Sequence, residues 1–157
     1  MDESLLPSPY KPKENSDECA RLIFEQFRWK DGKPRCPECG SWRPIYKQTR
    51  KGVPGYYRCP TLHGQSTKPL VFTVRTATLL ERSHVPFGKW LYCLAWYAYL
   101  PSQHRILPAT TLARLIDVNR KTASSILKLL GELRYGDQRN KGENSFLLEL
   151  MASIVRK

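Results

Sequence analysis

Two cysteine-containing segments constrain the fold of this chain more than any other feature. The first is Cys36-Pro37-Glu38-Cys39-Gly40, and the second combines Cys59 with His63. A Cys-x-x-Cys turn supplies two thiolates, and the following glycine lets the backbone curl toward a metal ion. Two such corners at this separation suit a tetrahedral zinc ion that joins two hairpins. We therefore expect one structural Zn²⁺, with Cys36, Cys39, Cys59 and His63 as its ligands.

The second corner leaves the identity of the fourth ligand open. A second Cys-x-x-Cys would place a ligand at position 62, which is Leu62, so His63 must serve from a Cys-x-x-x-His spacing. His84 and Cys19 are the substitutes if His63 points away. A redox-active cysteine pair is the other interpretation of Cys36 and Cys39, but the strand and helix that normally flank such a motif are not indicated by the sequence.

Length and composition are consistent with one domain or two small ones. The chain has 157 residues, of which 41% are hydrophobic, enough for a modest core. Three of its five cysteines are assigned to the metal, which argues against a disulfide framework. The sequence shows no apolar run of the roughly 20 residues that a membrane span requires, and its start does not resemble a signal peptide. We expect a cytoplasmic, nucleoid-associated protein with no membrane partner.

Charge indicates a polyanionic partner. The net charge is +12, and residues 28–75 contain eleven lysines or arginines against two carboxylates. Phosphate neutralisation with release of counterions makes nucleic acid the expected ligand of such a segment. Solvated basic side chains alone could also give this charge. The interleaved aromatic residues favour a surface with structured contacts, and they are Trp29, Trp42, Tyr46, Tyr56 and Tyr57.

The N-terminal half is expected to be a flexible arm, a helix and a ribbon of strands. Residues 1–15 are polar, contain three prolines and lack apolar periodicity, which indicates the arm. Ser16 is suited to cap a helix that runs to about Phe27 and buries Cys19. Segments 43–48, 54–58 and 70–75 are predicted as short strands of a zinc ribbon. The helix and ribbon together occupy residues 16–78.

A helical domain is expected over residues 79–135, which makes the fold class α+β. Pro86 opens an apolar run that ends at Pro101 and is typical of a buried helix. Residues 110–130 then follow the pattern of a helix, a short turn and a second helix. In a helix-turn-helix, Ala113 would allow close approach of the helices and Val118 would fill the core position of the turn. The inward side chains of the second helix would be Ala123, Ile126, Leu127 and Leu130.

Polar side chains on the outside of this second helix are the predicted DNA contacts. They suit a major groove and its phosphates, with arginine able to address guanine. Asn119 is expected to cap the helix. The alternative is an ordinary helical hairpin with a solvated basic face. The predicted DNA-binding residues of the helix are Asn119, Arg120, Lys121, Thr122, Ser124, Ser125 and Lys128, and those of the ribbon are Arg43, Lys47, Arg50, Lys51 and Arg58.

Residues 136–157 are predicted as a linker and a short amphipathic helix. Gly136 to Asn144 is polar, and Ser145 is suited to cap the helix. Its apolar stripe must be covered, either by the chain's own helices or by a second copy or another protein. The stripe consists of Phe146, Leu147, Leu150, Met151, Ile154 and Val155.

The order of these motifs resembles the N-terminal region of insertion-sequence (DDE-type) transposases, in which a zinc ribbon precedes a helix-turn-helix and a nuclease domain. The matching stretches cover most of residues 17–134 and are 27–32, 36–40, 57–59, 72–78, 85–90 and 112–134. The resemblance implies recognition of terminal-repeat DNA and ribbon ligands at Cys36, Cys39 and Cys59.

Three departures from that family limit what the resemblance implies. The family usually has a fourth cysteine soon after the third, where this chain has His63 and an insertion through Pro69. Ala77 stands where the family usually has glycine. Only 23 residues follow Arg134, too few for the carboxylate-bearing nuclease domain, so we expect no transposase catalysis from this chain alone.

The sequence therefore predicts a non-enzymatic, zinc-stabilised protein that binds double-stranded DNA with sequence preference. It would be a domesticated relative of such transposases that regulates transcription or a mobile element. One alternative is an accessory or truncated transposase subunit that binds element ends. Another is a protein-docking adaptor for a transcription or replication machine, in which the charge is incidental.

Overall fold

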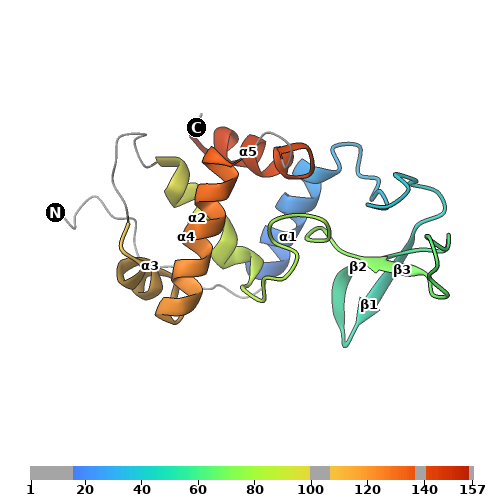
Figure 1. Ribbon diagram of the computed structural model, residues 1–157, viewed down its shortest axis with the longest axis horizontal. Helices are drawn as coiled ribbons and strands as arrows, with labels where there is room; N and C mark the ends of the chain where they lie inside the picture. Colours follow the sequence, from blue (N-terminus) through green and yellow to red (C-terminus); the bar gives the residue numbers. More distant parts are fainter. Residues whose placement is uncertain (1–15, 100–106, 137–140, 156–157) are drawn as a thin grey trace. The chain divides into compact units, whose positions relative to one another are not determined.

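The computed structural model describes residues 16–99, 107–136 and 141–155 (Figure 1). The predicted arm, residues 1–15, lies outside this range. Contacts divide the chain into two compact units. We call Arg21–His84 the ribbon unit, and we call the residues up to Ala20 together with those from Val85 onward the helical unit. A small antiparallel sheet precedes most of the helices, so the fold class is α+β, as predicted.

The ribbon unit contains one three-stranded antiparallel sheet. Its strands are β1 (Tyr46–Arg50), β2 (Val53–Cys59) and β3 (Leu70–Phe72), in that order across the sheet. The turn between β1 and β2 consists of Lys51 and Gly52, whose φ angles are 50° and 79°. Two successive positive φ values are the signature of a type I′ turn, whose twist matches that of the strands it joins. All three predicted strands are present, with shifted ends.

Strand β3 is shorter than predicted because, after Phe72, backbone N–H groups donate to threonine hydroxyls and not to a neighbouring strand. The Thr73 N–H donates to Thr76 Oγ1 at 2.9 Å, and the Arg75 N–H donates to Thr73 Oγ1 at 3.1 Å. Such local side-chain bonds offer the backbone an alternative to strand pairing. The chain then continues through Ala77, which has a φ of 61°. The strand therefore ends at Phe72 and a series of turns follows.

Three aromatic rings form the centre of the ribbon unit. The ring centroids of Trp29 and Tyr57 lie 5.3 Å apart in an edge-on arrangement, and Phe72 lies 5.7 Å from Tyr57. All three side chains are buried. Successive residues of a strand point to opposite faces, so Tyr57 faces inward while Tyr56 faces outward. Trp29 and Tyr57, which the sequence placed among surface aromatics, are therefore core residues.

Helix α1 (Ser16–Arg28) has the predicted extent but not the predicted buried face. Cys19 and Leu22 are exposed, whereas Ala20 and Phe24 are buried. Arg21 is 9% exposed and forms an ion pair with Glu25 one turn later. A long arginine stem can cover apolar surface when its charged end is paired, and an apolar pattern alone does not show this. The prediction that Cys19 lies in the core is wrong.

The helical unit is built from α2 (Phe87–Tyr99), α3 (Ala109–Ile116), α4 (Arg120–Tyr135) and α5 (Lys141–Val155). Helix α3 packs on α4, and α5 packs on α2 and α4. Within this unit, the Asp17 carboxylate accepts a hydrogen bond from the Gly88 N–H at 2.9 Å and so caps the start of α2. Its most deeply buried large side chains are Trp90, Leu94, Leu112, Ile116, Ile126, Leu130, Leu147 and Leu150. None of the described helices is both long and apolar enough to cross a membrane.

The C-terminal helix begins earlier than predicted. It starts at Lys141 rather than at Ser145, so much of the predicted linker is helical. Asn144 is 6% exposed and Phe146 is buried, so the packed face extends upstream of the apolar stripe. Tertiary packing of this kind overrides weak local preferences for a loop. The burial of Leu147, Leu150 and Met151 shows that the chain's own helices cover this part of the stripe.

Candidate functional site

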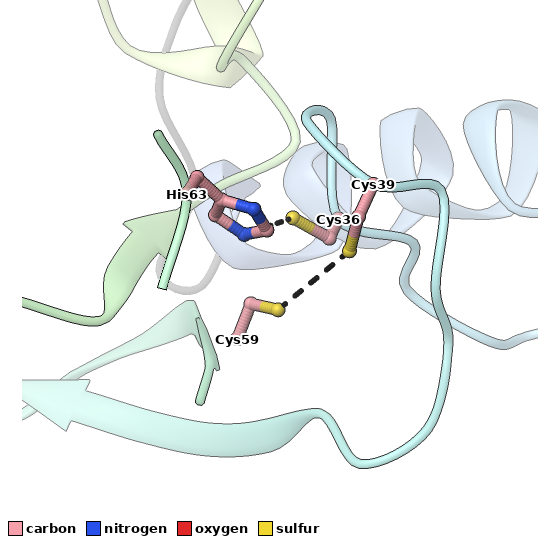
Figure 2. Close-up of side chains that lie close together, drawn as sticks. All are labelled: Cys36, Cys39, Cys59 and His63. Atoms are coloured by element: carbon pink, nitrogen blue, oxygen red, sulfur yellow. Dashed lines mark hydrogen bonds between the residues drawn. The ribbon is translucent and has the colours of Figure 1, made fainter. Parts of the chain in front are cut away.

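Four side chains converge in the ribbon unit and form a compact potential zinc site (Figure 2). Cys36 and Cys39 come from the turn before β1, Cys59 ends β2, and His63 lies in the loop that follows. One ligand atom from each residue lies within 4.8 Å of all the others. The set is the one predicted from the sequence, and it is consistent with one structural Zn²⁺.

Two of the separations between these atoms are close to the edges of a zinc tetrahedron. Cys39 Sγ lies 3.9 Å from Cys59 Sγ, and Cys36 Sγ lies 3.4 Å from His63 Nε2. Zn–S distances of about 2.3 Å and Zn–N distances of about 2.0–2.1 Å give edges of about 3.8 Å between two sulfurs and about 3.6 Å between sulfur and nitrogen. Three thiols and one imidazole at these separations are consistent with a tetrahedral zinc site.

Local hydrogen bonds shape the first cysteine corner. The Gly40 N–H donates to the Cys36 carbonyl at 2.8 Å, and the Cys36 N–H donates to the Ser41 carbonyl at 2.9 Å. Gly40 has a φ of 67°, a left-handed conformation that glycine adopts without strain. This glycine therefore has the conformation that a tight turn between the two cysteines requires.

The thiols differ in their readiness to ionise. Burial raises the pKa of the Cys36 thiol to about 11. Burial also acts to raise the pKa of Cys59, but hydrogen bonds to His63 and Thr61 outweigh it and lower that pKa to about 7. Only the deprotonated thiol is a metal ligand, so zinc binding must displace at least the Cys36 proton at neutral pH.

The two substitute ligands considered for the fourth position do not join this group. His84 and Cys19 are exposed, and neither belongs to the cluster. The remaining cysteine, Cys93, is buried on α2 in the helical unit, where burial raises the pKa of its thiol to about 12. A neutral, buried thiol of this kind is a core residue.

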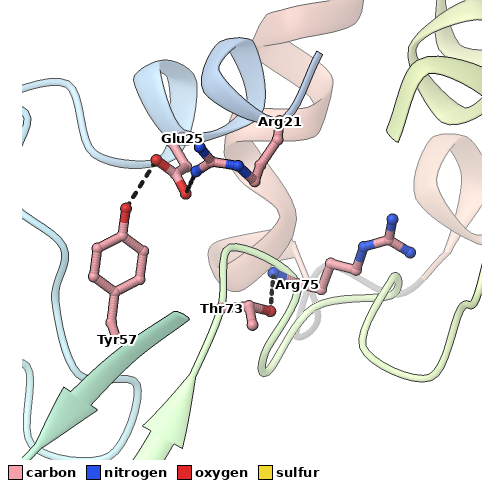
Figure 3. A network of polar contacts seen from close by, with 5 residues as sticks. All are labelled: Arg21, Glu25, Tyr57, Thr73 and Arg75. Carbon is pink, nitrogen blue, oxygen red and sulfur yellow. Dashed lines mark hydrogen bonds and ion pairs between the residues drawn. The ribbon is translucent and has the colours of Figure 1, made fainter. Parts of the chain in front are cut away.

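A polar network anchors β2 two residues before its zinc ligand (Figure 3). Tyr57 Oη donates to Glu25 Oε2 at 2.9 Å, and Arg21 pairs with the other oxygen of the same carboxylate. A Cβ atom on Gly55 would lie 2.6 Å from Arg21 Cδ, so glycine leaves room for the arginine stem. This network ties α1 to the inner face of the sheet. The sequence analysis did not identify it, because nothing in local periodicity links positions 25 and 57.

The predicted DNA-binding residues of the ribbon are arranged largely as cation–aromatic pairs. The Arg43 guanidinium lies 4.0 Å from the centre of the Trp42 ring, to which Lys33 also approaches. Arg50 lies 5.3 Å from the Tyr56 ring, and Arg58 lies 5.3 Å from the Tyr46 ring. Lys47 and Lys51 are exposed. Across the described residues, no carboxylate forms an ion pair with any of the five predicted cations.

The predicted contacts of the helical unit lie on the exposed side of α4. Arg120, Lys121, Ser124, Ser125 and Lys128 are exposed, while Ala123, Ile126 and Leu130 are buried. Asn119 Oδ1 accepts a hydrogen bond from the Thr122 N–H at 2.8 Å, so the predicted cap is confirmed. Lys128 Nζ lies 3.9 Å from Glu132 Oε1. Both side chains are exposed, so this ion pair leaves the lysine accessible.

The connection between α3 and α4 has a feature that the sequence analysis missed. Asp117 caps α3 in a left-handed conformation, with a φ of 51°. Its carbonyl oxygen accepts a hydrogen bond of 2.7 Å from Lys89 Nζ on α2. Lysine near a helix C-terminus interacts favourably with the helix dipole and with unpaired carbonyls. The three-residue turn is therefore fixed by α2 as well as by its own helices.

Comparison with known families supports the identity of the ribbon. Residues 15–61 match the family model of the transposase zinc-ribbon domain. The matched range contains Cys36, Cys39 and Cys59 and ends two residues before His63, so the fourth ligand rests on the geometry of the site. The chain has no match among curated proteins or solved structures.

Proposed function

We propose that this chain is a zinc-stabilised protein that binds double-stranded DNA with sequence preference and regulates transcription or a mobile element. Its ribbon belongs to a domain type that takes its name from transposases, whose substrate is DNA. The net charge of +12 favours the same ligand, because phosphate contacts gain free energy from counterion release. The function proposed here is binding, without catalysis.

The observation that carries this proposal is the division of α4 into a buried and an exposed side. Four apolar side chains face the core, and a row of arginine, lysine and serine residues faces outward from the first turn onward. In a helix-turn-helix, the N-terminal part of the second helix enters the major groove and its side chains meet base edges. Arg120 is in the first turn of α4, where it is suited to address the O6 and N7 atoms of guanine.

The ribbon would contribute contacts that are independent of sequence. Lys47 and Lys51 are exposed on the hairpin, and Arg43 is exposed before it. Phosphate contacts of this type position a protein on a duplex but carry little sequence information. The hairpin would therefore add affinity and salt dependence, while α4 would add preference for particular bases.

The zinc ion would be structural in this mechanism. Four protein ligands complete a tetrahedron, whereas a catalytic zinc site keeps one position for water or substrate. When bound, the ion joins the Cys36–Cys39 turn to the end of β2 and so holds the hairpin in place.

A second candidate function is favoured by the family match. An accessory transposase subunit would use the same surfaces to mark the ends of a mobile element for a partner nuclease. The two functions share their DNA-binding chemistry and differ in the site that is recognised.

Selection from a random duplex library tests the proposal. Zinc-loaded protein is incubated with the library at near-physiological salt, and the retained DNA is sequenced. Enrichment of one motif supports sequence-preferring binding, and a motif found at the ends of a mobile element favours the accessory subunit. Retention without enrichment, or no retention, contradicts the proposal and favours a nonspecific or protein-docking role.

A further inference from the structure

One face of the ribbon sheet combines aromatic and cationic side chains. In the register of the sheet, Tyr46 lies opposite Arg58, and Gln48 lies opposite Tyr56. Directly opposed residues share a face, and Tyr57, one residue from both Tyr56 and Arg58, points into the core. The pairs Tyr46–Arg58 and Gln48–Tyr56 therefore lie on the opposite side from the core. We call this the outer sheet face. It consists of Tyr46, Gln48, Tyr56 and Arg58 from the register, together with Arg50, whose guanidinium lies 5.3 Å from the centre of the Tyr56 ring.

The arginines of this face are held against the rings rather than by carboxylates. Arg58 lies over Tyr46, and Arg50 reaches Tyr56 across the bulge in β1. Within the described part of the chain, neither arginine forms an ion pair, and Arg58 Nε is buried without a hydrogen-bond partner. The face thus carries positive charge that no group of the described chain neutralises.

The tyrosines are partly available to a ligand. Tyr46 is 49% exposed, and Tyr56 is half-buried. Cation–aromatic pairing alone would stabilise the hairpin, but it does not neutralise the arginines. A ligand with flat rings and regularly spaced negative charges complements both features. Polynucleotides have this combination, and their phosphates would meet Arg50 and Arg58.

The tyrosine rings of the outer sheet face favour unpaired bases over a duplex as the ligand. Bases in a duplex are stacked on each other and present only their edges in the grooves, whereas unpaired bases can offer their ring faces. Open sheets that bind single strands use aromatic side chains and arginine planes to stack successive bases. We propose that the outer sheet face binds single-stranded DNA, with bases stacked on Tyr46 and Tyr56 and phosphates held by Arg50 and Arg58.

This site goes beyond the base recognition proposed for α4, and its tyrosines are not among the hairpin and loop cations proposed to contact duplex phosphates. Either activity can be present without the other, so their tests are separable. A protein with both would be suited to DNA in which a duplex adjoins an opened or single-stranded segment.

Binding of a labelled oligothymidylate of about 12 nucleotides, a length within the usual range of single-strand sites, tests the inference by fluorescence anisotropy. Replacing Tyr46→Leu or Tyr56→Leu removes the ring while keeping an apolar side chain. We expect each to weaken binding about tenfold, consistent with the loss of one stacked base. Tyr46→Phe and Tyr56→Phe keep the ring and should bind within about twofold of the parent protein. Zinc content and circular dichroism check that all four variants are folded.

The same variants are then tested on the duplex selected from the random library. Unchanged duplex binding together with weakened single-strand binding supports the inference. Cross-linking of 5-iodouracil in the oligonucleotide to Tyr46 or Tyr56 would support it directly. Equal single-strand binding by the parent and both leucine variants would overturn it. A parent protein that binds the duplex but not the oligothymidylate would overturn it too, while leaving the proposed function intact.

Discussion

Tyr57 donates a hydrogen bond of 2.9 Å to Glu25, a residue 32 positions earlier in the chain. Burial, followed by the negative charge of Glu25, raises the pKa of this phenol from its usual value of 10.0 to about 12. The neutral phenol is therefore stabilised in the folded state. The contact between helix and sheet thus also makes the stability of the ribbon depend on pH at the alkaline end.

Stability should fall between about pH 10 and pH 12 because of Tyr57. In this range the unfolded chain releases the phenolic proton while the folded chain retains it, so deprotonation favours unfolding. A shift of about two units corresponds to at most about 2.7 kcal/mol, present in full below pH 10 and lost as the pH approaches 12. Denaturant unfolding at a series of pH values measures this effect.

The stability of Tyr57→Phe should not show the fall that Tyr57 causes in the parent protein at alkaline pH. At neutral pH the variant should be less stable by about 1 kcal/mol, because the hydrogen bond to Glu25 is lost. Tyr46→Phe removes an exposed phenol and serves as the control. If the free energy of unfolding changes with pH in the same way for the parent and Tyr57→Phe, Tyr57 is not the cause of the alkaline loss of stability.

His63→Ala should abolish tight zinc binding, whereas His84→Ala should not. His63 supplies a ligand atom to the cluster, and His84 is exposed and outside it. Because zinc-binding free energy contributes to folding in such sites, His63→Ala and chelator treatment should both unfold the ribbon unit. Zinc analysis should give one ion per chain for the parent and for His84→Ala. Equal zinc content in the two histidine variants would refute the assignment of the fourth ligand.

Ala77→Gly should stabilise the protein by about 0.5–1 kcal/mol. Ala77 has a φ of 61°, where a Cβ atom is strained and glycine is not. The gain is reduced by the greater freedom of glycine in the unfolded chain. Ala152→Gly, at an exposed position within α5, is the matched control and should destabilise by about 1 kcal/mol. Thermal and denaturant unfolding compare the two, and a loss of stability in both variants would contradict the expected strain.

Asn119→Ala should destabilise the helical unit by about 1 kcal/mol, because it removes the side-chain cap of α4. Asn119→Ser preserves an oxygen that can accept from the Thr122 N–H and should retain most of the stability. If capping is the role of Asn119, the serine variant should also keep the preferred DNA motif. A changed motif with unchanged stability would instead indicate a base contact.

Arg120→Ala should weaken binding to the preferred duplex by about 1–3 kcal/mol and relax the preference for one or two bases. Removal of one positive charge from the hairpin should instead weaken binding to all duplex sequences similarly. It should also reduce the slope of log affinity against log salt concentration by about one. Lys51→Asn is the better variant for this purpose than Lys51→Ala, because Lys51 has a φ of 50° and asparagine tolerates that conformation. Titrations at several salt concentrations separate the two effects, and identical losses on specific and random duplexes for Arg120→Ala would exclude a reading role.

Features set by close spacing in the sequence were predicted well. Cys36 and Cys39 are held by one tight turn, and Asn119 caps the helix that directly follows it, so a few residues determine each geometry. His63 could be named as the fourth ligand only because the spacing offered few candidates. Its convergence with the cysteines depends on the path of the loop after β2, and that path is a property of the folded unit.

Features set by distant packing were not predictable in the same way. The face that α1 buries depends on Arg21, whose charge is compensated by Glu25 while its stem lies against Gly55. The early start of α5 depends on packing against α2 and α4, and the preceding polar sequence gives no sign of it. Trp29 and Tyr57 were assigned to a surface by composition, but the alternation of β2 and the fold of the unit direct them into the core.

The two-residue turn at Lys51 and Gly52 has a consequence for recognition as well as for folding. The backbone of such a short turn has little conformational freedom in the folded protein. The main-chain entropy of this segment is therefore lost when the protein folds and not when it binds a ligand. Lys51 is therefore presented on a preorganised turn. Inserting flexible residues into the turn should therefore weaken any contact made there without altering a single charge.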